Sequence, residues 1–267
     1  AYDASTGDTR WVRRYQGPAG GDDFVRSIDV SPEGSKVFVT GGATLRKTGT
    51  YGYATIAYDA STGEQLWVRL YNGPNHLRAF AEDLGASPDG STVFVTGYAF
   101  DSYVTVAYDA LTGERLWVSR YKAPGEAFFL GVSPDGSRVF VTGLAFDVTL
   151  DYVTVAIDSA TGKRLWVSRY NGRGNDADWV YDLGVSPDGS MVFVTGASVG
   201  TDRGEYATVA YDAVTGARSW VRRYNGPGKI RDGARGLAVS PDSAAVYVTG
   251  ISGGQSFDYV TIAYSTR

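Results

Sequence analysis

Residues 130–143 read LGVSPDGSRVFVTG, and similar stretches recur at four other places along the chain. The turn phrase is Ser-Pro-Glu-Gly at Ser31, Ser-Pro-Asp-Gly at Ser87, Ser133 and Ser186, and Ser-Pro-Asp-Ser at Ser240. Each copy leads into Phe-Val-Thr-Gly or Tyr-Val-Thr-Gly, an apolar strand signal. Pro presets the first central position of a type I turn, and Gly accepts the left-handed position after it. Each copy therefore predicts a β-hairpin.

A second phrase, Asp-Ala-x-Thr-Gly or a close variant, precedes each of five Trp residues. These are Trp11, Trp67, Trp117, Trp166 and Trp220, at spacings of 56, 50, 49 and 54 residues. A fixed period near 50 in a β-rich chain is typical of a propeller with one blade per repeat. The repeats therefore predict an all-β fold, a five-bladed β-propeller with four antiparallel strands per blade.

The repeats run from end to end, so we predict one domain over residues 1–267. Its blades are expected at about residues 25–71, 81–121, 127–170, 180–224, and 234–264 together with 9–15. The last repeat lacks a fourth strand, whereas the N-terminus has one to spare. We therefore expect Arg10–Tyr15 to pair with Tyr259–Tyr264, closing the ring and covering an exposed edge.

The stretches AYDASTGEQLW (57–67) and AYDALTGERLW (107–117) resemble the repeat of pyrroloquinoline-quinone-type propellers. LGVSPDGSRVFVTG is similar to the YVTN and WD40-like bacterial repeats. The resemblance covers the whole chain and implies the propeller fold. The quinone dehydrogenases of that family use more blades, and many carry an adjacent Cys pair near the cofactor. This chain has no Cys, so we expect no quinone and no other cofactor.

The net charge of −4 and the pI of about 5.1 argue against a nucleic-acid surface, which needs a basic stripe. No stretch of 18 apolar residues is present, so we expect no membrane span. The absence of Cys fits an extracytoplasmic bacterial protein, but many cytosolic proteins also lack Cys, so both compartments stay open. The chain is expected to be a monomer. Ala1 in place of Met leads us to expect a cut point in a longer chain or the start of a mature form.

The loops at one end of the predicted blades diverge among the repeats, whereas the turns at the other end are nearly constant. Divergence is explained equally well by drift in loops without packing roles and by a binding face. Alignment places six candidate ligand-binding residues where the inner strands begin at this variable end: Asp83, Phe129, Trp179, Tyr181, Asp182 and Arg235. We expect a non-catalytic scaffold that binds a protein or a glycan through this face.

A glycoside hydrolase acting through carboxylates at the channel mouth is the alternative. Asp83 and Asp182, with Glu82 and Glu126, are its candidate acids. Two carboxyl groups about 5 to 10 Å apart across an open cleft favour such chemistry. Solvated or cation-paired carboxylates explain the same residues without catalysis.

Two further groups of residues are considered as catalytic or metal-binding sites. His76 is the single His, and it lies in a Pro- and Asn-rich loop without a nucleophile phrase, so we expect a solvated side chain. The pairs Asp22-Asp23 and Asp176/Asp178 offer oxygen ligands for Ca²⁺, but the spacing of a calcium loop is absent. We therefore predict no metal and no catalytic residues.

Overall fold

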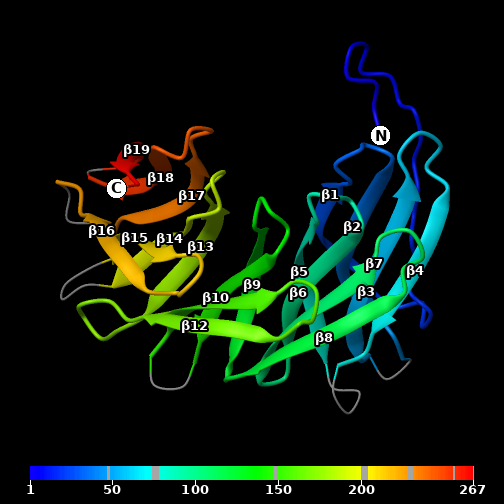
Figure 1. The fold of residues 1–267 in the computed structure, drawn as a ribbon, viewed down its shortest axis with the longest axis horizontal. Coiled ribbons are helices and arrows are strands. Elements are labelled where there is room, and N and C mark those ends of the chain that lie inside the picture. Colours follow the sequence, from blue (N-terminus) through cyan, green and yellow to red (C-terminus); the bar gives the residue numbers. More distant parts are fainter. Residues whose placement is uncertain are drawn as a thin grey trace. The chain divides into compact units, whose positions relative to one another are not determined.

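The computed structural model describes residues 1–46, 49–73, 78–146, 149–199, 204–227, 231–254 and 256–266. Every regular element in these ranges is a β-strand (Figure 1). The strands form five antiparallel sheets, four with four strands and one with three. They belong to two compact units, residues 1–120 and 121–267. The predicted all-β class with antiparallel sheets is confirmed.

Unit 1 contains two sheets and ends within β8. Its strands are β1 (Phe24–Val30), β2 (Lys36–Thr44), β3 (Tyr51–Asp59), β4 (Gln65–Tyr71), β5 (Ala79–Ala86), β6 (Thr92–Ala99), β7 (Ser102–Asp109) and β8 (Arg115–Lys122). Strands follow one another in each sheet as simple meanders, in the orders β1-β2-β3-β4 and β5-β6-β7-β8.

Unit 2 contains three sheets. Its strands are β9 (Gly125–Val132), β10 (Arg138–Ala145), β11 (Asp151–Asp158), β12 (Arg164–Tyr170), β13 (Asp178–Val185), β14 (Met191–Val199), β15 (Gly204–Asp212), β16 (Arg218–Tyr224), β17 (Gly233–Val239), β18 (Ala245–Gly253) and β19 (Phe257–Ser265). The first two sheets have four strands each, and the third is β17-β18-β19.

The two repeated phrases form turns whose side chains replace missing backbone partners. In the Ser-Pro-Asp-Gly turn, Ser87 Oγ donates to Asp89 and accepts from the backbone N–H of Thr92 at 2.9 Å. In the Asp-Ala-Ser-Thr-Gly turn, Asp59 Oδ1 accepts the backbone N–H groups of Ser61 and Thr62. A hydrogen bond from the Ser61 hydroxyl, together with those from Thr62 and the Ser61 N–H, lowers the pKa of Asp59 to about 2. The turn geometry predicted from Pro, Asp and Gly is therefore confirmed.

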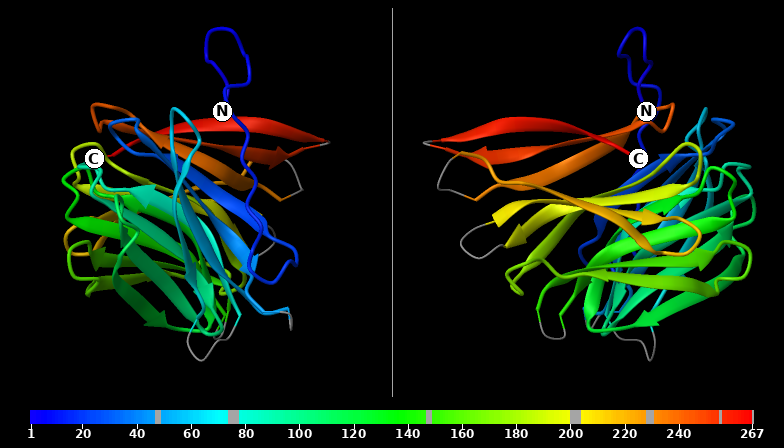
Figure 2. Two further views of the ribbon diagram at one scale, coloured as in Figure 1. Left: turned by 90° about the vertical axis from the view of Figure 1, so that its right-hand side faces the viewer. Right: turned by 60° about the vertical axis from the view of Figure 1, so that its left-hand side comes forward.

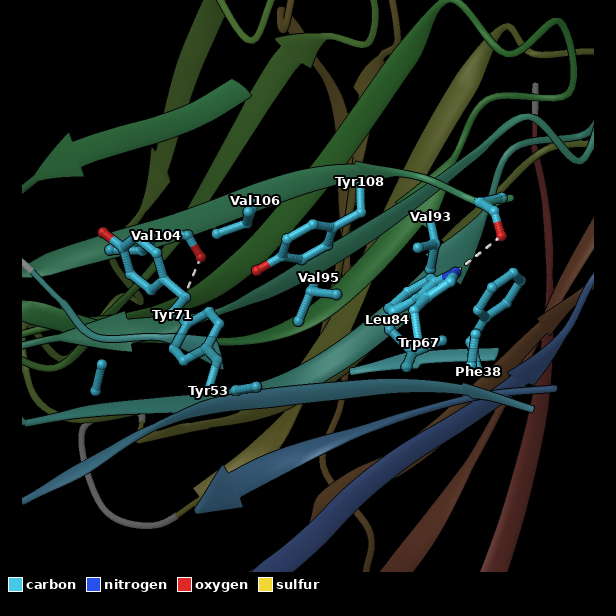
Figure 3. Close-up of a cluster of buried hydrophobic side chains, with 14 of the residues drawn as sticks. Phe38, Tyr53, Trp67, Tyr71, Leu84, Val93, Val95, Val104, Val106 and Tyr108 are labelled. Atoms are coloured by element: carbon cyan, nitrogen blue, oxygen red, sulfur yellow. Dashed lines mark hydrogen bonds between the residues drawn. The ribbon is translucent and has the colours of Figure 1, made fainter. Parts of the chain in front are cut away.

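The repeated Trp packs against the turn of the following sheet. The indole N–H of Trp67 donates to the carbonyl of Ala110 at 3.2 Å, and its ring lies 5.9 Å from that of Phe38 (Figure 3). Gly113 has a φ of +70°, and a Cβ there would lie 2.7 Å from the Trp67 ring. Glycine is required at this turn both by its backbone angle and by this contact.

Side chains from both sheets of unit 1 form its core, which is shown in Figure 3. The aromatic members come mainly from the first sheet, and aliphatic residues of β6 and β7 face them. The buried set includes Phe38, Tyr53, Trp67, Tyr71, Leu84, Val93, Val95, Val104, Val106 and Tyr108. The Tyr53 hydroxyl donates to the Val104 carbonyl at 3.1 Å, so the one polar atom of this ring is satisfied across the two sheets.

Paired threonines link the second and third strands of each sheet. In each sheet the hydroxyls of one Thr on the second strand and one on the third approach within hydrogen-bond distance. The pairs are Thr40–Thr55, Thr96–Thr105, Thr142–Thr154, Thr195–Thr208 and Thr249–Thr261, at 2.9 to 3.1 Å. These hydroxyls join neighbouring strands, a role that β propensity alone does not indicate.

Each inner strand carries a β-bulge at the same repeat position. The extra residues are Arg26, Glu82, Phe128, Tyr181 and Arg235. Next to the bulge the strands approach so closely that a Cβ on Gly97 would lie 1.9 Å from the Phe80 carbonyl oxygen. The Gly that ends the Val-Thr-Gly phrase is therefore needed for a close backbone contact and not for a turn. The bulge bends each inner strand near its start, and so it changes the direction of the side chains there, at the variable end.

The last sheet has three strands in the described residues, and Arg10–Tyr15 is not part of any described ladder. The chain begins instead with a small hairpin held by the Tyr2–Thr9 bridge, which projects away from the unit 1 sheets (Figure 2). The following segment lies against the first sheet, where the Trp11 indole donates to the Ala60 carbonyl at 3.0 Å. The pairing of Arg10–Tyr15 with β19 stays a prediction.

Candidate functional site

Two of the six candidate residues, Tyr181 and Arg235, are in contact at the start of the inner strands β13 and β17. The guanidinium carbon of Arg235 lies 4.0 Å from the centre of the Tyr181 ring. Trp179, two residues before Tyr181, is 42% exposed, whereas the repeat residue Trp67 is 5% exposed. Trp179 offers an exposed flat apolar face on the same strand as Tyr181, and Arg235 offers a cation stacked on the Tyr181 ring. We call Trp179, Tyr181 and Arg235 the unit 2 cluster.

Asp182 follows the bulge in β13 and is held by two backbone groups. Its Oδ1 accepts the N–H of Leu183 at 2.8 Å, and its Oδ2 accepts the N–H of Leu237 at 2.7 Å. Burial raises the pKa of this carboxyl, and the two backbone hydrogen bonds oppose the rise. Asp182 therefore ties β13 to β17, a role that alignment of the repeats does not reveal.

Asp83 belongs to unit 1 and has a similar structural role. Its Oδ1 accepts the Ser27 hydroxyl at 2.7 Å and the Leu84 N–H at 2.9 Å. It therefore connects β5 to β1. Both candidate carboxylates accept hydrogen bonds from within their own unit. The sequence alone suggests solvated or cation-paired carboxylates, and these hydrogen bonds are a third arrangement.

The remaining predicted positions are partly engaged in packing. Phe129 is half-buried, packs against the unit 2 core and lies 6.4 Å from Phe128. Glu82 forms an ion pair with Arg26 at 3.3 Å. Burial raises the pKa of Glu126, which lies on β9.

Two of the Asp residues considered for Ca²⁺ hold loops through hydrogen bonds to backbone N–H groups. Asp23 accepts the N–H groups of Gly17 and Thr44, and Asp178 accepts that of Gly172 at 2.6 Å. Burial raises the pKa of Asp178 to about 6, and the neighbouring Ser198 hydroxyl and the Gly172 N–H oppose the rise. Across the described part of the chain, no group of three His, Cys, Asp or Glu side chains is placed to hold a metal. His76 lies outside the described residues.

An aromatic cluster at the variable end of unit 1 was not among the predicted site residues. The rings of Phe24 and Tyr51 lie 5.8 Å apart, those of Tyr51 and Phe80 5.2 Å, and those of Phe80 and Tyr98 5.6 Å. We call these four residues the ring ladder. Phe24 and Phe80 occupy equivalent repeat positions, but Tyr51 and Tyr98 lie where the repeats diverge, so comparison of the copies cannot identify them.

The first sheet has an uncovered apolar face. Ile28 on this face is 66% exposed, whereas Leu84 at the equivalent position of the second sheet is 5% exposed. A cavity of about 500 Å³ lies over the face, lined by residues such as Val39 and Ile56 and bordered by Trp11. Residues that are packed in one sheet thus stand open in its neighbour.

Within the described ranges, no helix has the length and hydropathy needed to cross a bilayer.

The family model described as outer membrane protein assembly factor BamB matches residues 1–100 and 100–256. Among characterised proteins, methanol dehydrogenase (cytochrome c) subunit 1 of Paracoccus denitrificans is 34% identical over 86 residues. That match spans 32% of this chain and 13% of the dehydrogenase subunit.

Solved structures with the same fold have low sequence identity. The match to Kuenenia stuttgartiensis hydrazine synthase covers 100% of this chain and 67% of the synthase chain, with a TM-score of 0.65 and 17% identity. Pseudomonas aeruginosa periplasmic gluconolactonase covers 90% of this chain and 69% of its own, with a TM-score of 0.55 and 18% identity. The β-propeller domain of the trilobed protease from Pyrococcus furiosus, described as having an open velcro topology, covers 92% and 69%, with a TM-score of 0.56 and 10% identity. The propeller-repeat fold predicted from the repeated phrases is confirmed.

Proposed function

Because the chain belongs to the family of the outer membrane protein assembly factor BamB, we propose that it acts as a binding propeller and not as a catalyst. Catalysis needs unlike groups that converge on one reacting atom. The candidate acids Asp83 and Asp182 are instead held by hydrogen bonds that join strands. A family known by the name of an assembly factor is in keeping with a role in binding.

The proposed ligand site is the unit 2 cluster, with Asp182 beside it and Phe129 on β9. The single observation that carries this assignment is the exposure of Trp179 at the variable end, since the other Trp residues serve the repeat contacts. A flat aromatic face with a few charged groups suits a glycan or a protein loop. The residues proposed to bind are Trp179, Tyr181, Phe129, Asp182 and Arg235 of unit 2, and Asp83 of unit 1 stays a separate prediction.

Screening the chain on glycan and peptide arrays tests the proposal. The double variant Trp179→Ala/Asp182→Ala should lose the ligand found on the array while it stays folded by circular dichroism. The matched control is Ser87→Ala in a constant turn, which should retain binding. Retained binding in the double variant, with loss in the turn variant, would place the site at the opposite end.

A hydrolase is the second candidate, and one observation favours it. Burial raises the pKa of both Asp182 and Glu126 on neighbouring inner strands of unit 2, as a general acid requires. Release of reducing ends from a polysaccharide, abolished by Asp182→Asn and by Glu126→Gln, would establish this activity. Binding without turnover would leave the scaffold role.

We also infer that the five sheets form the blades of one closed ring, with Arg10–Tyr15 as the fourth strand of the last blade. Trp11 and Arg13 contact the turn at residues 59–63 through the same atoms that Trp67 and Arg69 use on the next turn. This segment thus takes the place of the outer strand of a preceding blade. Tyr259 of β19 is 94% exposed, whereas its repeat equivalent Tyr206 is 0% exposed, and ring closure would cover such a residue.

We also propose a location and an assembly state for the chain. Relatives are named for the outer membrane and the periplasm, which favours a bacterial, extracytoplasmic site of action. We propose a monomer, because a closed ring leaves no sheet edge for pairing with another copy. Cell fractionation and analytical ultracentrifugation measure the two properties directly.

A further inference from the structure

Arg78 lies over the ring ladder of unit 1 in a fixed position. Its guanidinium carbon is 4.5 Å from the centre of the Phe80 ring and 5.3 Å from that of Tyr51. Arg78 is exposed, whereas Tyr51 and Phe80 are half-buried. Cation–π contact with two rings restricts the guanidinium while the residue remains accessible to solvent.

The cation of Arg78 has no partner among the residues that the structure describes. Other arginines differ: Arg26 pairs with Glu82, and Arg69 donates to the carbonyls of Gly113 and Thr112. Within the described ranges, no carboxylate and no hydrogen-bond acceptor contacts the Arg78 guanidinium. An oriented fork of donors without an acceptor is suited to a carboxylate from a ligand.

Exposed aromatic surface adjoins this cation. Phe24 at the end of the ring ladder is 48% exposed. Phe100, on the connection that follows β6, is 72% exposed and has a φ of +55°, an unusual backbone angle for a bulky residue. The flat C–H faces of sugar rings pack well on such aromatic faces, while a neighbouring cation selects an acidic group.

We propose that the ring ladder and Arg78 form a second binding site, specific for a glycan that carries sparse acidic sugars. The carboxylate of one sugar pairs with Arg78, and the sugar ring or its neighbour stacks on Phe24. The site rests on the proposed binding role but shares no residue with the unit 2 cluster. A net charge of −4 disfavours dense polyanions such as nucleic acids, and a single free guanidinium matches one carboxylate.

The test uses an oligosaccharide of alternating glucuronate and N-acetylglucosamine, titrated into the whole chain by calorimetry. The same oligosaccharide with its carboxyls reduced to alcohols is the neutral control. Arg78→Ala should weaken binding of the acidic form by about tenfold or more, as expected for loss of a charge-assisted hydrogen bond. Arg78→Lys should recover part of the affinity, and Phe24→Ala should weaken the acidic and the neutral forms alike.

Three comparisons decide the result. Arg115→Ala makes the same charge change at the constant end and should leave binding unchanged. Equal affinity for the reduced oligosaccharide, tighter binding of a glutamate-rich peptide, or no measurable binding of the acidic form would each overturn the proposal. If Arg235→Ala abolishes binding and Arg78→Ala does not, the ligand belongs to the unit 2 cluster, so this proposal fails while the proposed function stands.

Discussion

Single carboxylates hold the loops at the variable end of this protein. Asp23, Asp178 and Asp232 each accept the N–H of a Gly six residues earlier, which closes a compact loop before the inner strand. Asp178 is buried, and its Oδ1 lacks a hydrogen bond within the described residues. Such a group is costly to ionise, so its protonation is linked to folding.

Asp178 should make stability depend on pH. Burial raises its pKa in the folded chain to about 6 from an ordinary value of 3.8. Between these values the unfolded chain loses the proton and the folded chain keeps it, so the free energy of unfolding falls as pH rises. Urea unfolding of the parent and of Asp178→Asn at pH 4, 5, 6 and 7 measures this. The stability of the parent relative to the variant should fall from pH 4 to about 6 and then level off, and a constant difference would contradict the assignment.

Trp67 should be a stability residue with no role in ligand binding. It is buried against Phe38 and Tyr108 and donates to the Ala110 carbonyl. Trp67→Ala should lower the free energy of unfolding by about 3–5 kcal/mol, the usual cost of truncating a buried aromatic side chain. Trp179→Ala is the matched control and should cost much less. Similar losses in both variants, measured by denaturant titration, would show that Trp179 is also a packing residue.

At the scale of the element, the hairpin is the unit that the sequence predicts best. The turn phrases carry their own chemistry, Pro and Gly for the backbone and Asp, Ser and Thr for hydrogen bonds, so local sequence suffices to locate the strands. The bulge at Arg26 and its equivalents was not predicted, because an extra residue in one strand leaves no local sequence signal. The hydrogen bond that Asp182 accepts from β17 depends on how the two strands are aligned, which the sequence does not show. The ring ladder depends on loops that have no equivalent in the other repeats.

The close contact beside the bulge should make Gly97 intolerant of any side chain. A Cβ there would lie 1.9 Å from the Phe80 carbonyl oxygen, so Gly97→Ala must separate β5 from β6. We expect Gly97→Ala to lower the free energy of unfolding by about 3 kcal/mol or more, the upper end of the usual cost of overpacking. Gly34→Ala is the comparison, since Gly34 has a φ of +73° but open space around it, and should cost only about 1–2 kcal/mol. The denaturation midpoint of Gly97→Ala should be the lower of the two, and the reverse order would refute the steric argument.

At the scale of the whole molecule, the first and last sheets carry exposed apolar side chains. The apolar face of the first sheet and Tyr259 on β19 are exposed where the equivalent residues of other sheets are buried. Exposed apolar area of this kind is unfavourable in water, so each surface is expected to be covered when the ring is closed. Ring closure was predicted from the number of strands in the repeats. That number shows that one strand is missing from the last repeat, but it does not show which residues of the two strands would contact one another.

Deleting residues 1–15 should remove the proposed closing strand and lower the melting temperature, with aggregation through the free edge of β19. Deleting residues 1–9 alone is the control, because it removes the projecting hairpin and keeps Trp11 and Arg13 on the first sheet. Differential scanning calorimetry and light scattering report both effects. Equal melting of the two truncated chains and the parent would mean that Arg10–Tyr15 closes nothing.

The contact between a repeat Trp and the following turn also bears on how such a gene can change in length. Trp166 donates to Ala213 just as Trp67 donates to Ala110, so each of these two joints is built from the end of one repeat and the start of the next. Duplication of any single stretch from one Trp to the next, 49 to 56 residues, would reproduce both halves of a joint in frame. Arrays of this kind can therefore gain or lose whole repeats by recombination without creating a mismatched contact.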